Sequence, residues 1–192
     1  MKLKLNRRVF TFSLLILTIV VFSNLISCDY ITENNKAKIE KEHQKEEVVT
    51  NMNEAKILVQ ASEYNLDVIE LCEIIKRETK EDSIREMLNG IQNEQEKIFE
   101  KYKEVASNNI ITLPRFSELA TTVEGDVSTD EDLKAYLNLM NSKIYHQRDL
   151  IKRLSDTTDN SSFKTLADYA SESLRNSLKK TNETLQELEK DT

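Results

Sequence analysis

The chain has 192 residues, with 27 Lys and Arg against 34 Asp and Glu, and only two Gly and one Pro. This length allows one compact domain with a tail, and the scarcity of turn residues excludes a sandwich or barrel of many short strands. The formal charge of −7 argues against a nucleic-acid partner. Two Cys and two His cannot build a Cys/His zinc finger or a disulfide framework. The composition predicts an acidic all-α protein.

The amino-terminal segment has the pattern of a secretion signal. A basic head precedes the apolar run Val9–Val21, a length that is typical of a signal peptide. The alternative is a permanent membrane anchor over Val9–Ile26, which approaches the length of a spanning helix. The residues that follow favour the signal, because they resemble a bacterial lipobox: Leu25, Ile26, Ser27 and Cys28. The resemblance implies cleavage before Cys28, a diacylglyceryl group on its thiol and an acylated amino group, so we expect residues 1–27 to be a lipoprotein signal peptide.

Lipidation would place the protein in the bacterial cell envelope, with the membrane as its first partner. Several acyl chains, of the palmitate class, hold a protein on a bilayer nearly permanently. We favour the outer membrane and leave the periplasmic and surface faces open. Residues 28–51 are polar and predict a tether, and their Glu40-x-x-His43 match lies outside any apolar pattern, which argues against a metal site. The chain from Cys28 onward carries a formal −11, so we expect its acidic body to stand off the lipid surface.

Residues 52–192 show the apolar spacing of three and four that is typical of amphipathic helices. The pattern predicts helices at about 53–78, 81–106, 130–154 and 161–189. Ser128 to Glu131 fit a capping box before the third helix, and Ser161 or Ser162 can cap the fourth. Four helices of similar length bury their apolar faces most simply in an up-down-up-down arrangement. We therefore predict an antiparallel four-helix bundle.

Four polar residues interrupt the apolar rows, one in each helix: Asn65, Gln95, Gln147 and Ser177. Helical rise places them at similar heights, so they could form a hydrogen-bonded core layer or a small-ligand pocket. Alternatively, they lie at the edges of wide apolar stripes.

Other chemistry-bearing residues have structural interpretations. Cys72 is expected to be a small buried hydrophobe, and His146 a solvated residue on the flank of the third helix. Tyr64 and Tyr102 have the spacing of core aromatics. The acidic row that includes Asp67 predicts a solvated face.

Residues 54–190 resemble the ferritin-like bacterial envelope proteins of domain-of-unknown-function family 4142. The motifs that carry the resemblance are Ala61-Ser62, Ile91 to Gln95, Leu113-Pro114, Tyr136-x-x-x-Met140 and Leu174-x-x-Ser177-Leu178. The resemblance implies a four-helix bundle, secretion or lipidation, and no established reaction. Its members often carry His where this chain has Gln95, Ile144 and Ser177, so metal binding by relatives does not transfer to this sequence.

No pattern in the sequence predicts a reaction. The apolar rows contain no carboxylate and no His, whereas di-iron bundles need inward Glu and two Glu-x-x-His pairs, which excludes a ferroxidase. A Gly-rich phosphate loop and a Gly-x-Ser-x-Gly elbow are also missing. We therefore expect no catalytic residue, metal or cofactor, and a structural or interaction role with an unknown protein partner. The alternatives are a surface-exposed lipoprotein that binds a host or extracellular protein, and a small-ligand carrier.

Overall fold

The computed structural model describes residues 40–42, 45, 49–119 and 129–190. The chain divides into two compact units, Met1–Val49 and Thr50–Thr192, and the second is called the helical unit below. All regular secondary structure in the described ranges is helical, without a strand. The all-α prediction is therefore confirmed.

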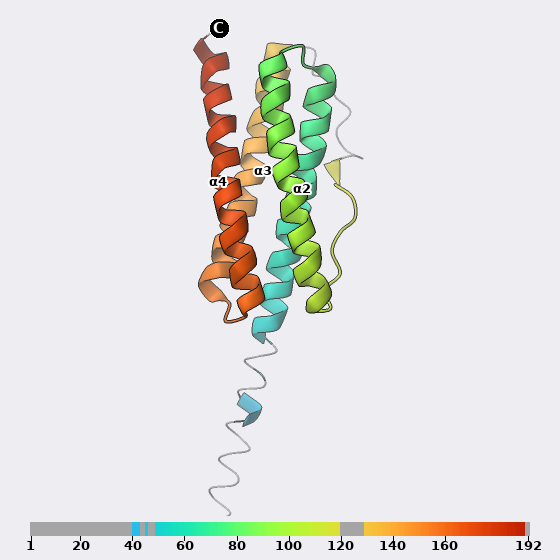
Figure 1. The fold of residues 1–192 in the computed structure, drawn as a ribbon, viewed down its shortest axis with the longest axis vertical. Coiled ribbons are helices and arrows are strands. Elements are labelled where there is room, and N and C mark those ends of the chain that lie inside the picture. The colour runs from blue at the N-terminus through green and yellow to red at the C-terminus, as the bar shows by residue number, and fades with distance from the viewer. Residues whose placement is uncertain (1–39, 43–44, 46–48, 120–128, 191–192) are drawn as a thin grey trace, which may run out of the picture. The chain divides into compact units, whose positions relative to one another are not determined.

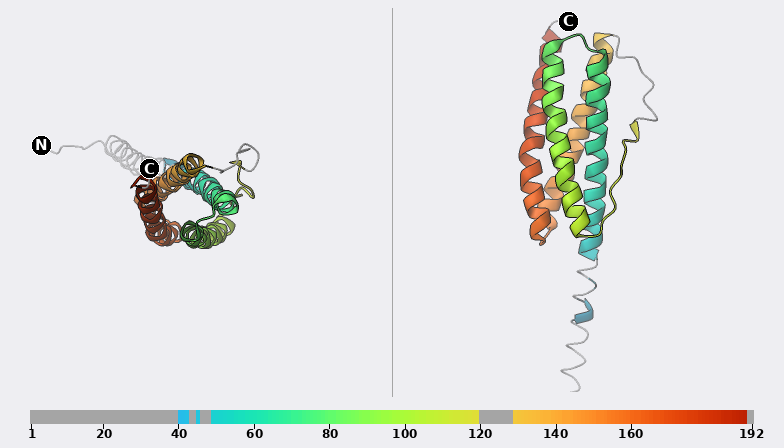
Figure 2. Two further views of the ribbon diagram at one scale, coloured as in Figure 1. Left: turned by 90° about the horizontal axis from the view of Figure 1, so that it is seen from above. Right: turned by 45° about the vertical axis from the view of Figure 1, so that its right-hand side comes forward.

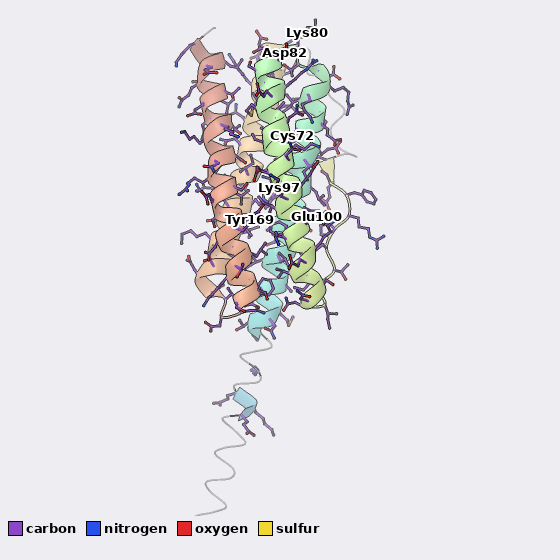
Figure 3. The ribbon with its side chains drawn as sticks, in the orientation of Figure 1. Cys72, Lys80, Asp82, Lys97, Glu100 and Tyr169 are labelled. Carbon is purple, nitrogen blue, oxygen red and sulfur yellow. The ribbon has the colours of Figure 1, made fainter. Side chains whose placement is uncertain are left out.

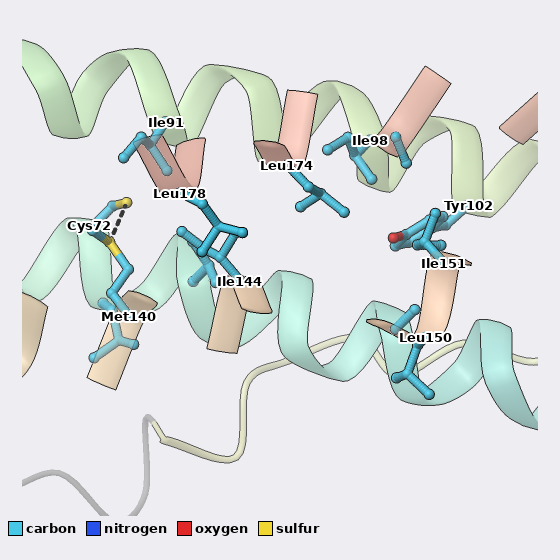
Figure 4. Close-up of a cluster of buried hydrophobic side chains, with 14 of the residues drawn as sticks. Cys72, Ile91, Ile98, Tyr102, Met140, Ile144, Leu150, Ile151, Leu174 and Leu178 are labelled. Atoms are coloured by element: carbon cyan, nitrogen blue, oxygen red, sulfur yellow. Dashed lines mark hydrogen bonds between the residues drawn. The ribbon is translucent and has the colours of Figure 1, made fainter. Parts of the chain in front are cut away.

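The helical unit is built from long helices that lie side by side (Figures 1 and 2). The chain is helical over 49–78, and α2 (Asp82–Asn108), α3 (Asp130–Thr157) and α4 (Ser161–Lys190) follow. Each helix turns one apolar stripe inward, because residues three and four apart share a helix face. The stripes meet in one core, part of which Figure 4 shows.

Side-chain caps begin α3 and α4, each one residue away from the predicted position. Thr129 is the N-cap of α3, where its Oγ1 accepts from the Asp132 amide at 3.1 Å and its own amide donates to Asp132 Oδ2 at 3.2 Å. This reciprocal pair is a capping box that starts at Thr129 rather than Ser128. Asn160 Oδ1 accepts from the Ser162 amide at 2.9 Å, so Asn160, and neither Ser161 nor Ser162, caps α4.

Cross-contacts fix the relative directions of the 49–78 helix and α3. Glu54 accepts a hydrogen bond from Thr158, and Cys72 Sγ donates to Met140 Sδ at 3.6 Å. Residue numbers fall along α3 as they rise along the 49–78 helix, so the two helices run in opposite directions. An up-down-up-down order would give the first and third helices the same direction. The opposite directions of these two helices therefore contradict the up-down-up-down part of the prediction.

The connection between α2 and α3 accounts for these directions. The last turn of α2 lies beside the α3–α4 turn, where Asn160 Nδ2 donates to Asn109 Oδ1 at 3.3 Å. α3 begins at the opposite end of the helical unit, so the 109–129 connection joins opposite ends (Figure 1). On the way Ile111 and Leu113 pack on the core, and Ser117 Oγ donates to Asp67 Oδ1 at 2.6 Å. The sequence pattern marked this segment as a loop but carried no signal of its direction.

Candidate functional site

The four polar residues of the apolar rows are all inside the helical unit. Asn65, Gln95 and Gln147 are completely buried and Ser177 is almost so. They do not lie at the edges of the stripes, which was the alternative interpretation. Deep burial requires each amide to find partners within the protein or a bound molecule.

Helix register places these residues at one level. Glu54 lies opposite Thr158 and Cys72 opposite Met140, so Asn65 lies opposite Gln147. The Asn141 side chain on α3 donates to Asn182 on α4 at 3.0 Å, which puts Gln147 level with Ser177. Gln95 is joined to the same level by its direct hydrogen bonds to Asn65. We call these four residues the amide layer.

Two hydrogen-bonded pairs involve the amide layer, one within it and one between Gln147 and Tyr102 on α2. Asn65 Nδ2 donates to the main-chain oxygen of Gln95 at 2.9 Å and to its Oε1 at 2.5 Å. Gln147 Nε2 donates to the Tyr102 hydroxyl at 3.1 Å. The sequence interpretation of Tyr102 as a plain core aromatic missed this role. Its signal was the presence of Tyr rather than Phe at a buried position, because a buried phenol hydroxyl needs a partner.

Three polar atoms of the layer have no partner: Asn65 Oδ1, Gln95 Nε2 and Gln147 Oε1. Together they offer one NH2 group with two donor hydrogens and two acceptor oxygens, without formal charge. Unpartnered buried groups of this kind are the usual partners of buried waters, which typically make about three hydrogen bonds. The layer is thus chemically suited to water or a small neutral polar molecule. A divalent metal would find no anionic ligand among these side chains.

No group of three or more His, Cys, Asp or Glu residues suited to a metal occurs in the part of the chain that the structure describes. Glu40 is exposed on a helical stretch, and His43 lies outside the described residues. His146 is exposed and stacks on Tyr64, with ring centroids 5.6 Å apart. The expectation of a solvated His146 is confirmed.

Asp67 differs from its predicted place on a solvated face. It is buried, its Oδ2 lies 2.8 Å from Lys143 Nζ, and Ser117 donates to its other oxygen. Lys143 Nζ also lies 5.3 Å from the centre of the Tyr64 ring. The neighbouring Glu63 carboxyl has a raised pKa because of burial and because of repulsion by Glu118 and Asp67. The ion pair joins the 49–78 helix to α3, and the Ser117 hydrogen bond attaches the 109–119 segment to Asp67.

Cys72 is a buried core residue, as the sequence interpretation expected. Its side chain is completely buried and contacts Met140 (Figure 4), and Figure 3 labels its place in the helical unit. Burial raises the pKa of its thiol to about 12, although Lys76 acts in the opposite direction. The thiol is therefore protonated at neutral pH and is a poor nucleophile.

The predicted signal peptide, the lipobox residues Leu25, Ile26 and Ser27, and the lipidation site Cys28 lie outside the described residues. Within the described ranges, no helix is both long enough and apolar enough to cross a membrane. Comparison with protein-family models, with curated proteins and with solved structures finds no match to this chain.

Proposed function

We propose that the chain is a non-enzymatic lipoprotein of the bacterial cell envelope, in which acyl chains on Cys28 hold a helical module at the membrane. The observation that carries this proposal is the order of basic head, apolar run and lipobox in residues 1–28. A triacylated cysteine would supply an anchor that does not depend on a membrane-spanning helix. The module would then act as a structural or interaction element at the membrane.

We further propose that residues 50–190 form an antiparallel four-helix bundle of the ferritin-like kind. The cross-contacts between the 49–78 helix and α3 support opposite directions for that pair. On the other side of the core, Ser173 Oγ on α4 donates to Glu94 Oε2 on α2 at 3.1 Å. One long connection between the second and third helices is the feature that distinguishes ferritin-like bundles from simple alternating ones. The resemblance to domain-of-unknown-function family 4142 is part of the same proposal.

The interior supports a structural role rather than a catalytic one. General acid–base catalysis needs a titratable group that can reach a substrate and change its protonation state near neutral pH. The amide layer offers neutral amides and a hydroxyl. Burial shifts the pKa of the Cys72 thiol and the Tyr102 phenol upward, away from neutrality.

Metabolic labelling with a fatty acid tests the proposed anchor. The unaltered chain should incorporate label and fractionate with membranes, whereas Cys28→Ala should lose both properties. The matched control is Cys72→Ala, which removes the other cysteine and should keep the label, because Cys72 is buried and remote from the lipobox. Equal labelling of the unaltered chain and Cys28→Ala would contradict the proposal.

A second candidate function, binding of an extracellular protein, is favoured by one surface feature. A hollow of about 410 Å³ lies between α2 and the connecting segment, and its walls include Phe99, Ala106, Ile111 and Leu113. The apolar part of these walls suits an apolar peptide side chain, and Lys103 and Arg115 also line the hollow. Protease treatment of intact cells separates the candidates: degradation of the helical unit favours surface binding, and protection favours a periplasmic module.

A further inference from the structure

The two ends of the bundle differ in charge. The anchor end, defined as residues 50–60, 101–113 and 152–171, contains Thr50, the residue at which the helical unit begins. The far end comprises residues 70–92, 130–142 and 181–190, and Figure 3 labels Lys80 and Asp82 there. The anchor end holds six basic and five acidic residues, whereas the far end holds six basic and twelve acidic residues. The negative charge of the described bundle is therefore concentrated at the far end.

This asymmetry changes the expected behaviour beside a membrane. A uniformly acidic body would be repelled by an anionic leaflet over its whole surface, which was the basis for expecting it to stand off. Repulsion acts within about 8 Å at physiological salt, so the residues nearest the lipid decide the interaction. The anchor end, with nearly balanced charge, can approach an anionic surface that would repel the far end.

The anchor end also exposes large apolar side chains. Ile110 is 96% exposed and Met52 is 69% exposed. Hydrogen bonds connect the neighbours of these two residues through the α3–α4 turn. Asn160 in that turn donates to Asn109, which precedes Ile110. Thr158 in the same turn donates to Glu54, which lies two residues after Met52. The corresponding large apolar residue at the far end is Leu139, which is only 36% exposed.

The backbone at Ile110 holds its side chain outward at a conformational cost. Its φ is 58°, a left-handed conformation that is rare for a β-branched residue. The Ile111 amide donates to Ala106 O at 2.8 Å and the Ile110 amide to Ser107 O at 3.4 Å, which together form a Schellman motif. Gly is the usual residue at this position. An exposed isoleucine in a conformation that suits glycine points to a role outside the folded chain.

We propose that the anchor end is a membrane-contacting surface, in which Ile110 and Met52 enter the lipid interface while the acidic far end points away from it. The inference rests on the proposed lipidation of Cys28. Twenty-one residues lie between Cys28 and Thr50, and even fully extended they span at most about 75 Å. Such a tether keeps the effective concentration of the lipid surface on the order of millimolar, so two apolar side chains suffice for frequent contact.

The test uses the fact that the chain contains no Trp. Ile110→Trp and Met52→Trp report from the anchor end, and Leu139→Trp is the matched control at the far end. Each full-length lipidated variant is purified from membranes and reconstituted into phosphatidylcholine vesicles with phosphatidylglycerol, with and without brominated phosphatidylcholine. Circular dichroism checks the fold of each variant, and Met52→Trp carries the test if the strained position 110 does not accept Trp.

The expected result is a shift of the emission of the two anchor-end variants to shorter wavelength, and quenching by brominated lipid that Leu139→Trp does not show. Equal quenching at both ends, or none at the anchor end, would overturn the proposal. A shift without lipid quenching would also overturn it, because it would indicate contact with protein instead. Intact mass of the same samples reports the acyl chains on Cys28 separately, so failed lipidation and failed membrane contact are distinguishable.

Discussion

Replacing Ile110 with glycine should stabilise the helical unit. A left-handed residue other than glycine destabilises the folded state by roughly 1–2 kcal/mol, and glycine relieves this strain. Glycine also gives the unfolded chain more conformational freedom, which offsets about 0.5–1 kcal/mol of the gain. Because Ile110 is 96% exposed, its removal forfeits little burial. We therefore expect a net gain of about 0.5–1 kcal/mol, or roughly 1–4 °C in melting temperature for a unit of this size.

Urea unfolding followed by circular dichroism measures this gain, with the chain from residue 29 onward and without lipid. Ile111→Gly is the matched control. It removes a half-buried side chain that packs on the core, so it should destabilise the protein by about 1–3 kcal/mol. A loss of stability in Ile110→Gly would refute the reasoning, because it would mean that the exposed isoleucine makes contacts that outweigh its backbone strain.

Three further substitutions test other parts of the structure. Gly90→Ala should stabilise α2 by about 0.5–1 kcal/mol in urea unfolding, because a Cβ there would meet Lys180 Nζ at an ordinary 3.5 Å; a loss would refute this. Tyr102→Phe should cost about 1–3 kcal/mol by leaving Gln147 Nε2 unpaired. Adding Gln147→Leu should recover part of that loss, and additive losses would show that the bond contributes little. The folded Cys72 thiol keeps its proton up to a pKa of about 12, against 9.0 for an ordinary thiol. The free energy of unfolding should therefore fall by about 1.4 kcal/mol per pH unit above pH 9. Cys72→Val should remove this contribution to the fall. If the variant loses stability with pH as steeply as the unaltered chain, the Cys72 thiol titrates normally.

The helices were predictable because their apolar residues repeat with the helical period over many turns. The sequence left two interpretations of Asn65, Gln95 and Gln147 open, burial in the core or a place at the edge of the apolar stripe, because each residue interrupts an apolar row. Whether such a residue faces the core or its rim depends on the rotation of each helix by a few tens of degrees, which the row alone does not fix. Tyr102 was recognised as core, but the partner of its hydroxyl is on a helix that is distant in sequence.

The order of the helices could not be derived from the pattern. An amphipathic helix buries its stripe equally well in either direction, so direction is decided by the connection. The connection from 109 to 129 is long enough to join opposite ends of the helical unit, and the contact of Ser117 with Asp67 is part of what holds its 109–119 part in place. Because Asp67 is spaced like the surface acids near it, its pairing with Lys143 was also invisible in the sequence. The strain at Ile110 arises from a Schellman motif, which the sequence usually reveals by a glycine at the left-handed position. Here that position holds isoleucine, so nothing in the sequence indicated the motif.

The most direct test of the central claim is the intact mass of the native chain extracted from bacterial membranes. The expected polypeptide begins at Cys28 and carries a diacylglyceryl group and an amide-linked acyl chain on that residue. A membrane-associated chain that still begins at Met1, or one whose Cys28 carries no lipid, would contradict it.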